Sequence, residues 1–404
     1  MNKNQPESRR TAPWTRPRHR VAWAIFRPFI GLYARLKYGV RARRFREPGP
    51  HLILFNHQTP FDQFFVMMSV PGAVYYLATE DIFSIGWPAK LMSWLAAPIP
   101  IRKQSTDTRA IRTMIKVARE GGTVCLAPEG NRTYSGKTEY MRPAIAPLAR
   151  KLGLPVALYR IEGGYGVEPR WSDKTRRGRI DAGVSRVIPP EEYAGMSDEA
   201  LFEEIRQGLY VNEAKADAEF RSERRAEYLE RAVYVCPFCG LTEFRSEGNE
   251  IKCLRCGRWV HYAPDKHLEG VNFDFPFDFV NDWYEYQKNY VNQLDLTQAV
   301  GAPLFRDRAS VSRVIPCERK EPLRKNAALA LYGDRVEIDG DWVLPFREIT
   351  ASAVLGRNKL NLYHGGEIYQ FKGSRRFNAL KYVNLIHRYQ NMTQGDKHGE
   401  FLGL

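Results

Sequence analysis

The chain has 404 residues, of which 44% are hydrophobic and 12% aromatic, and its 61 Lys and Arg outnumber its 46 Asp and Glu to give a net charge of +15. This composition excludes a mostly disordered chain, and the length predicts two or three domains because one domain usually takes about 150 residues. No apolar run reaches the roughly 18 uncharged residues that a membrane-spanning helix needs, and the polar start shows no secretory signal sequence. We therefore expect a cytoplasmic protein.

Positive charge is concentrated in the first 50 residues, which hold 13 Lys and Arg and two acids. Such an arm can bind nucleic acid or an anionic membrane surface. Between residues 21 and 37 the cations are interleaved with large apolar side chains such as Phe29 and Leu36, a mixture typical of a helix lying in the lipid headgroup layer. We expect residues 1–40 to contact the cytoplasmic face of a membrane, as a peripheral attachment; a disordered tail before an ordinary docking helix is the alternative.

Short apolar strands alternate with helical patterns from residue 51 onward. The strands are expected at 51–56, 73–78, 99–101, 123–127 and 155–161, and the helices at 61–70, 86–96, 108–120 and 142–151. This alternation indicates an α/β sheet with flanking helices, and the uneven spacings favour a mixed, partly parallel sheet. Residues 197–231 are charge-rich and also have a helical pattern. We expect this α/β domain to span 41–231.

A histidine and an aspartate flank the turn after the first strand, in the sequence NHQTPFD (56–62). His57 ends the strand, and Asp62 lies in the first turn of the next helix, from which it can reach back to the imidazole. A carboxylate there fixes the tautomer through Nδ1–H and leaves Nε2 to take a proton. The alternative is that Thr59 and Asp62 only cap the helix. The motif supplies no serine or cysteine nucleophile, so the reacting hydroxyl can belong to a substrate.

Further polar segments follow other strands of the predicted sheet. Arg102 follows one strand, and the sequence PEGNR (128–132) follows the next. Because the C-terminal ends of parallel strands gather at one edge of a sheet, we expect these segments to lie near His57. Arginine side chains and a glycine backbone N–H suit a phosphate monoester. Glu129 in such a pocket either orients an arginine or accepts a hydrogen bond from a substrate hydroxyl.

These motifs, in this order and at these separations, resemble those of the glycerolipid acyltransferase family, specifically the 1-acyl-sn-glycerol-3-phosphate acyltransferases. The family's first motif, NHxxxxD, matches Asn56, His57 and Asp62. Its second motif ends in an arginine that Arg102 matches, although the preceding glycine and phenylalanine are absent.

The third motif of the family is commonly Pro-Glu-Gly-Thr-Arg. It matches Glu129, Gly130 and Arg132, with asparagine at position 131 in place of threonine. The fourth motif, a proline-valine strand start, matches Pro155-Val156. As a set of four, the motifs are specific.

The resemblance covers about residues 20–230 and implies transfer of a fatty acyl group from acyl-CoA or acyl carrier protein to the free hydroxyl of 1-acyl-sn-glycerol-3-phosphate, giving phosphatidate. It assigns His57 and Asp62 to catalysis, with His57 taking the proton of the acceptor hydroxyl. It assigns substrate binding to Asn56, Arg102, Glu129, Gly130 and Arg132. The departures in the second and third motifs leave another lyso-lipid acceptor open.

Four of the six cysteines form two CxxC pairs, each followed by glycine: Cys236 with Cys239, and Cys253 with Cys256. Four thiolates in this spacing indicate structural tetrahedral zinc in a zinc ribbon, and rubredoxin-like iron is the alternative. We place the ribbon at 232–262.

Because the predicted ribbon is basic, a third hypothesis is a nucleic-acid-binding or regulatory protein with an inactive acyltransferase-like domain. The intact pair of His57 and Asp62 weighs against it, so nucleic acid is not expected as a partner.

The C-terminal part changes to short alternating strands. After an aromatic helical linker at 263–324, strand patterns begin near residue 325 and a helical pattern covers 376–390. We expect a small β-rich domain at 325–404, similar in outline to a pleckstrin-homology-type barrel closed by one C-terminal helix.

Overall fold

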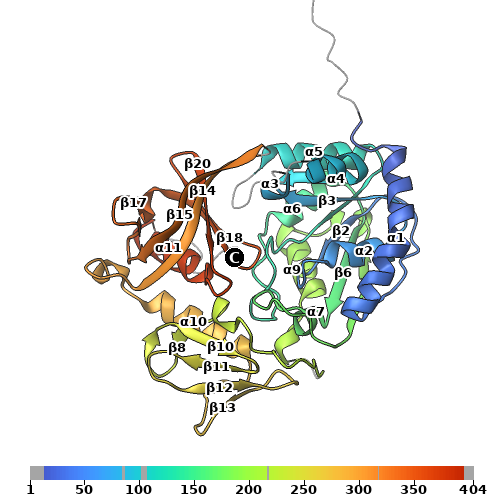
Figure 1. The fold of residues 1–404 in the computed structure, drawn as a ribbon. Helices are drawn as coiled ribbons and strands as arrows, with labels where there is room; N and C mark the ends of the chain where they lie inside the picture. The colour runs from blue at the N-terminus through green and yellow to red at the C-terminus, as the bar shows by residue number, and fades with distance from the viewer. Residues whose placement is uncertain (1–12, 84–86, 102–106, 216–217, 317, 395–404) are drawn as a thin grey trace, which may run out of the picture.

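The computed structural model describes residues 13–83, 87–101, 107–215, 218–316 and 318–394. Three parts follow one another along the chain: an α/β unit, a cysteine-containing ribbon and a C-terminal β unit (Figure 1). The α/β unit and the C-terminal β unit lie opposite each other, and the ribbon lies beneath them in this view.

A seven-stranded mixed sheet forms the centre of the α/β unit. Its strands are β1 (Val40–Ala42), β2 (Leu52–Phe55), β3 (Val74–Thr79), β4 (Ile99–Ile101), β5 (Thr123–Leu126), β6 (Val156–Glu162) and β7 (Ile180–Ile188). The order is β1-β7-β6-β2-β5-β3-β4, and every neighbouring pair is parallel except β6 with β7. The predicted mixed, partly parallel sheet is confirmed. Because β2, β5 and β6 run in the same direction, the segments that follow them leave the sheet at one edge.

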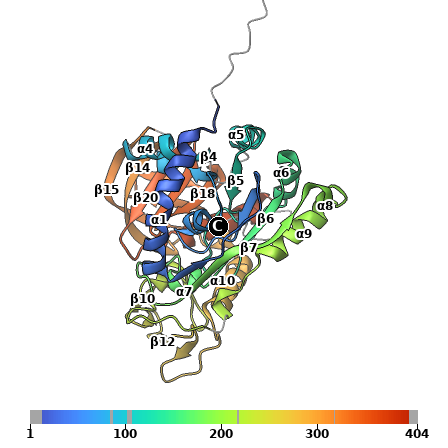
Figure 2. The same ribbon diagram turned by 90° about the vertical axis from the view of Figure 1, so that its right-hand side faces the viewer.

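Helices cover both faces of this sheet. They are α1 (Pro17–Tyr38), α2 (Asp62–Ser69), α3 (Glu80–Phe83), α4 (Trp87–Ala96), α5 (Thr108–Arg119), α6 (Ile145–Leu152), α7 (Gly164–Val167), α8 (Pro190–Ala194) and α9 (Asp198–Leu209). Leu52 and Leu54 of β2 pack in the core under α5, α6 and α9, whereas Ile53 and Phe55 pack in the core under α1 and α2. Figure 2 shows these two layers on opposite sides of the sheet. A strand buried on both faces must be apolar throughout, which explains why every residue of β2 is apolar.

The helix predicted over 197–231 ends early, at Leu209. Two short 3₁₀ turns follow, η1 (Glu213–Lys215) and η2 (Leu229–Arg231). Some charged side chains of this segment pair with near neighbours, as Arg206 does with Glu203, whereas Arg231 makes long-range contacts. Arg231, only 2% exposed, donates to the backbone oxygen of Trp171 at 2.8 Å and pairs with Asp173 at 2.7 Å.

The ribbon and the C-terminal β unit share one continuous hydrophobic core, which includes Ile251 of the ribbon, Trp283 of the connecting helix and Leu362 of the β unit. The ribbon and its connection contain β8 (Val235–Cys236), β9 (Gly240–Leu241), β10 (Phe244–Glu247), β11 (Glu250–Cys253), β12 (Trp259–Tyr262), β13 (Leu268–Gly270), α10 (Val280–Gln293) and η3 (Leu296–Gln298). Two residues of the α/β unit, Tyr134 and Trp171, also belong to this core. The three parts are therefore packed together.

The C-terminal unit is an antiparallel half-barrel of seven strands, as the predicted β-rich domain requires. Its elements are β14 (Phe305–Ile315), β15 (Arg319–Leu331), β16 (Arg335–Ile338), β17 (Trp342–Pro345), η4 (Phe346–Glu348), β18 (Ile349–Leu355), β19 (Lys359–His364), β20 (Glu367–Gly373) and α11 (Leu380–Gln394). The strand order is β17-β16-β15-β14-β20-β19-β18, with α11 packed against β18 and β19.

The sheet of this unit begins at Phe305, ahead of the boundary predicted at 325. The first strand of this sheet, β14, has charged or polar side chains at about half of its positions, so its sequence has no continuous apolar run. In β14, Phe305, Ala309 and Val311 are buried while the residues between them are partly or fully exposed. That alternation is the pattern of a strand with one solvated face. The predicted helical linker at 263–324 therefore contains the helix α10 but ends before Phe305, where β14 begins.

The longest described helix, α1, has 22 residues and carries Arg27 near its middle. Within the ranges that the structure describes, no helix combines the length and apolar character needed to cross a lipid bilayer.

Candidate active site

The turn between β2 and α2 holds His57 against Asp62, with 2.8 Å between Nδ1 and Oδ2. Asp62 is fully buried, and its carboxylate also accepts hydrogen bonds from the backbone N–H of Gln58 at 2.6 Å and of Thr59 at 2.9 and 3.0 Å. The Thr59 hydroxyl donates to it at 2.6 Å. Helix α2 begins at Asp62, one residue after the predicted start at 61, and no side chain caps it at Phe61. The carboxylate of Asp62 instead fixes the turn before the helix and orients the imidazole.

His57 is placed to act as a neutral base. Its side chain is 23% exposed, and burial lowers its pKa from 6.5, helped by the nearby cations Arg132 and Arg170 and opposed by Asp62. A lowered pKa keeps the imidazole uncharged at neutral pH. With Nδ1–H donated to the carboxylate of Asp62, the lone pair lies on Nε2.

Glu129 joins two loops through its carboxylate oxygens. Its Oε1 accepts from the backbone N–H of His57 at 2.8 Å, and its Oε2 accepts from the backbone N–H of Glu139 at 2.8 Å. Burial raises the pKa of Glu129 to about 8, although both backbone donors oppose the rise. The two roles expected for Glu129 from the sequence stay predictions, and the described contacts show the carboxylate holding the backbone of His57 to that of Glu139.

Two further residues expected to bind substrate are also engaged by backbone. Gly130 adopts a φ of +69°, a conformation that favours glycine, and its N–H donates to the oxygen of Ala127 at 3.0 Å. Asn56 is fully buried, with Nδ2 donating to the oxygen of Ile161 at 2.8 Å and Oδ1 accepting from its N–H at 2.7 Å. Asn56 therefore ties the end of β2 to β6, and Gly130 closes the turn after β5. Arg102 lies outside the described residues.

Arg132 is the predicted phosphate ligand whose side chain remains available. Its Nη1 is buried and has no hydrogen-bond partner among the described residues. Burial, and next the neighbouring Arg170, lower the pKa of Arg132 to about 10. A buried guanidinium with an unsatisfied N–H is costly unless an anion pairs with it. The position is therefore suited to an anionic group of a substrate.

The sequence analysis missed a segment that packs directly on the catalytic turn. Helix α7 and the residues after it follow β6, at the same sheet edge as His57. The N–H of Tyr165 donates to Oε1 of Gln58 at 2.9 Å, and Nη1 of Arg170 donates to the oxygen of Arg132 at 2.8 Å. A Cβ at Gly164 would lie 2.6 Å from Cβ of Gln58, so only glycine allows this approach. The position of this segment directly after a predicted parallel strand could have identified it.

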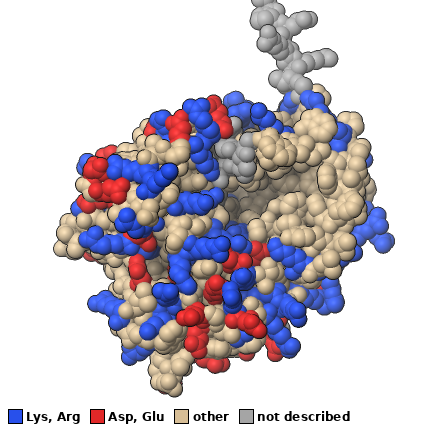
Figure 3. Space-filling view, in the orientation of Figure 1, with Lys and Arg blue, Asp and Glu red and all other residues tan. Residues whose placement is uncertain are grey.

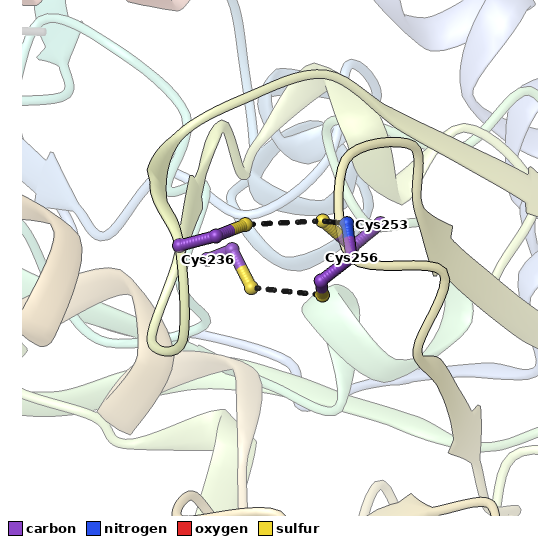
Figure 4. A group of neighbouring side chains, drawn as sticks. Cys236, Cys253 and Cys256 are labelled. Atoms are coloured by element: carbon purple, nitrogen blue, oxygen red, sulfur yellow. Dashed lines mark hydrogen bonds between the residues drawn. The ribbon is translucent and has the colours of Figure 1, made fainter.

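The four ribbon cysteines converge on one point, so that each Sγ lies within 4.8 Å of the others. Cys236 and Cys256 have their Sγ atoms 3.8 Å apart, and Cys239 and Cys253 have theirs 3.6 Å apart, without a disulfide between them (Figure 4). A tetrahedral zinc with bonds of about 2.3 Å separates its sulfur ligands by about 3.8 Å. The four thiolates therefore fit a tetrahedral metal ion in size, number and chemistry.

The α/β unit is similar to known proteins. Residues 39–160 match the family model described as Acyltransferase, and this region contains both His57 and Asp62 as well as Arg132. This part of the chain is therefore similar to the acyltransferase family. The match bears out the resemblance to acyltransferases that the four motifs predicted.

Relatives of this acyltransferase domain include the 1-acyl-sn-glycerol-3-phosphate acyltransferase alpha of Homo sapiens, which is 26% identical over 190 residues. That match covers 44% of this chain and 65% of the human protein. The chloroplastic 1-acyl-sn-glycerol-3-phosphate acyltransferase BAT2 of Brassica napus is 23% identical over 163 residues, covering 40% of this chain and 45% of the relative. The chain thus spans less than two thirds of the length of these relatives.

A solved structure is also similar to this chain. The crystal structure of the 1-acyl-sn-glycerophosphate acyltransferase PlsC from Thermotoga maritima superposes with a TM-score of 0.41 at 20% identity. The match covers 48% of this chain and 80% of that chain.

Proposed function

We propose that this protein transfers a fatty acyl group from an acyl thioester to the free hydroxyl of 1-acyl-sn-glycerol-3-phosphate, giving phosphatidate. The single observation that carries the proposal is the neutral imidazole of His57, oriented by Asp62, near the guanidinium of Arg132, whose buried Nη1 has no partner among the described residues. The named activity of the relatives supports the same acceptor.

The reaction needs one base and one anion site. Nε2 of His57 takes the proton from the acceptor hydroxyl while the oxygen attacks the thioester carbonyl. The tetrahedral intermediate collapses with cleavage of the C–S bond, and the imidazolium returns the proton to the departing thiolate. General-base assistance contributes about 10²–10⁴-fold, so placing the hydroxyl through its phosphate must supply much of the remaining acceleration. The donor is acyl-CoA or acyl carrier protein.

A peripheral membrane attachment would give the enzyme access to its lipid acceptor. Helices α1 and α4 lie side by side (Figures 1 and 2). Both expose large apolar side chains to solvent. These side chains are Val21, Ile25, Phe26, Phe29, Leu32, Tyr33 and Leu36 on α1, with Trp87, Leu91 and Trp94 on α4. Contiguous exposed apolar surface marks an interaction site, and the arginines of α1 would favour anionic lipid. We propose that this surface rests on the cytoplasmic face of a membrane.

We also propose that the ribbon holds structural zinc. All four ligand positions belong to the protein, so the ion would have no open site for substrate. It would stabilise the small ribbon that joins the α/β unit to the C-terminal unit.

Replacing His57 with alanine is expected to lower phosphatidate formation by at least about 10²-fold, because the general base is lost. The measurement is transfer of a labelled acyl group from acyl-CoA or acyl carrier protein to lysophosphatidate by the purified chain. His267→Ala removes an exposed histidine that pairs with Asp265 at 3.1 Å and serves as the matched control. Retained turnover in a folded His57→Ala protein would overturn the assignment, and faster acylation of a different lyso-lipid by the wild-type chain would replace the acceptor.

Activity is expected to fall at acid pH, with the midpoint of the fall below pH 6.5. Burial and neighbouring arginines lower the pKa of His57 from its ordinary 6.5, so the active neutral form persists to lower pH than for a solvated histidine. Activity is lost as the pH falls through this lowered pKa. A profile of kcat/KM for the acceptor over pH 4.5–8, measured at saturating donor, tests this because kcat/KM reports ionisations of the enzyme before the acceptor binds; a fall in activity centred above pH 6.5 would contradict it.

Binding to vesicles that contain anionic phospholipid is expected to depend on the apolar surface of α1. The double variant Phe29→Asp, Leu36→Asp adds charge at side chains that are 68% and 79% exposed, so it should reduce co-flotation at least tenfold without lowering the melting temperature. Val343→Asp, at a 43% exposed position of the C-terminal unit, is the control. Equal flotation of both variants and the wild type would refute the membrane surface.

The purified chain is expected to contain one zinc per molecule, measured by mass spectrometry of the metal. Chelation should lower the melting temperature, because the ion closes a unit too small for its own core. Cys125→Ser, at a buried position outside the cluster, should retain the metal, whereas Cys256→Ser should lose it. Iron at the same stoichiometry, or no metal in freshly purified protein, would exclude the zinc site.

A further inference from the structure

The C-terminal β unit reaches the catalytic edge of the α/β unit through the end of β18. Arg170, which donates to the oxygen of Arg132, also donates through Nη2 to the oxygen of Val354 at 3.1 Å. The side chain of Arg170 therefore connects the third family motif to β18, at a residue 184 positions after Arg170 itself. In Figure 1, β18 lies on the side of the C-terminal unit that faces the α/β unit.

The turn after β18 extends an arginine across this interface. Arg357 pairs through Nη2 with Oε1 of Glu168, which is 4% exposed, and its Nη1 lies 3.5 Å from Oδ1 of Asp173. Glu168 and Asp173 belong to the segment that packs on the catalytic turn. The guanidinium of Arg357 is itself only partly exposed, with 30% of the side chain accessible.

Arginine side chains are concentrated in this cluster. The cations include Arg132, Arg170, Arg231 and Arg357, and the carboxylates that face them include Asp62, Glu168 and Asp173. Arg231 and Arg170 direct their N–H groups to protein oxygens, whereas Nη1 of Arg132 has no partner among the described residues. An anion paired with Nη1 of Arg132 would also attract the guanidinium of Arg357, which lies close enough for its charge to lower the pKa of Arg132.

The surface between the two units is hollowed. Figure 3 shows this hollow with Lys and Arg side chains on the side of the C-terminal unit and mostly uncharged residues on the side of the α/β unit. A cationic wall opposite an uncharged wall suits a ligand with an anionic head and an apolar chain.

We propose that Arg357, supplied by the C-terminal β unit, binds the phosphate of the acceptor together with Arg132, so that the two units share one active site. This inference rests on the proposed function for the identity of the acceptor. Glu168 pairs with Arg357 when no phosphate is bound, so its carboxylate competes with the phosphate for the guanidinium. The C-terminal unit is then part of the acceptor site and not only an attached module.

The alternative is that the pair of Arg357 and Glu168 only fastens the two units together. Two variants separate these roles. Arg357→Ala removes both the ion pair and a phosphate ligand, whereas Glu168→Gln removes the ion pair and leaves the guanidinium. Arg347→Ala, which removes a cation that is 74% exposed on the same unit and pairs with Glu348, is the matched control.

With saturating acyl donor, Arg357→Ala is expected to raise the KM for lysophosphatidate about ten- to hundred-fold, the loss typical of one charge-assisted contact. Its kcat should stay within about twofold, and the KM for the donor should not change. Arg357→Lys should recover part of the loss. Glu168→Gln should leave the acceptor KM unchanged or lower it, since it removes a competing carboxylate. An equal rise in Arg357→Ala and Glu168→Gln, or no rise in Arg357→Ala, would overturn the proposal.

Binding of sn-glycerol 3-phosphate to the full chain, followed as a rise in melting temperature, tests Arg357 without turnover. The wild type, Glu168→Gln and Arg347→Ala should show the rise, and Arg357→Ala should show little or none. An equal rise in Arg357→Ala, or no rise in the wild type, would refute the phosphate site. Absence of phosphatidate synthesis with an intact wild-type binding shift would instead reject the proposed reaction and leave the role of Arg357 standing.

Discussion

The buried carboxylate of Asp62 is the constraint on which the catalytic turn depends. An ionised carboxylate removed from water costs several kcal/mol unless donors surround it. Here the imidazole of His57, two backbone N–H groups and the hydroxyl of Thr59 supply those donors. The turn cannot relax without leaving the charge unpaired. The orientation of the His57 imidazole is therefore a consequence of how the turn folds.

Two further side chains near this turn are also held by hydrogen bonds to backbone groups. Glu129 connects the backbone of His57 to that of Glu139, and Asn56 connects the end of β2 to Ile161. Both residues match family motifs, yet both have their polar atoms engaged by protein. They act by holding three loops at fixed separations, which leaves Arg132 as the described motif residue with a free donor at the site.

The packing of the three parts is consistent with the proposed contribution of the C-terminal unit to the acceptor site. One hydrophobic core runs through the ribbon, the helix α10 and the half-barrel, and it includes Trp171 of the α/β unit. A continuous core resists relative motion of its parts because close-packed side chains cannot slide without opening voids. A residue on the turn after β18 can therefore be held against the catalytic edge with the accuracy that a binding site requires.

Much of the α/β unit and of the site could be predicted from the sequence, because the determining interactions are local. The strand ending at Phe55, the turn from His57 to Asp62 and the CxxC pairs are set by residues a few positions apart, where periodicity and spacing carry the information. Parallel strands also place their C-terminal ends at one edge, so the meeting of the first and third motifs could be expected. The charged strand β14 was missed because its alternation is visible only once one face is known to be buried.

Only the tertiary structure shows which polar atoms of the site residues are already hydrogen-bonded to other parts of the protein. The sequence determined that His57, Asp62, Glu129 and Arg132 would gather, but not that Glu129 would turn both oxygens to backbone. The contact between Arg357 and Glu168 could not be predicted from the sequence, because no local pattern indicates a contact between residues 189 positions apart. Such a contact depends on how two separately folded surfaces pack, and the free energy of that packing is spread over the whole shared core.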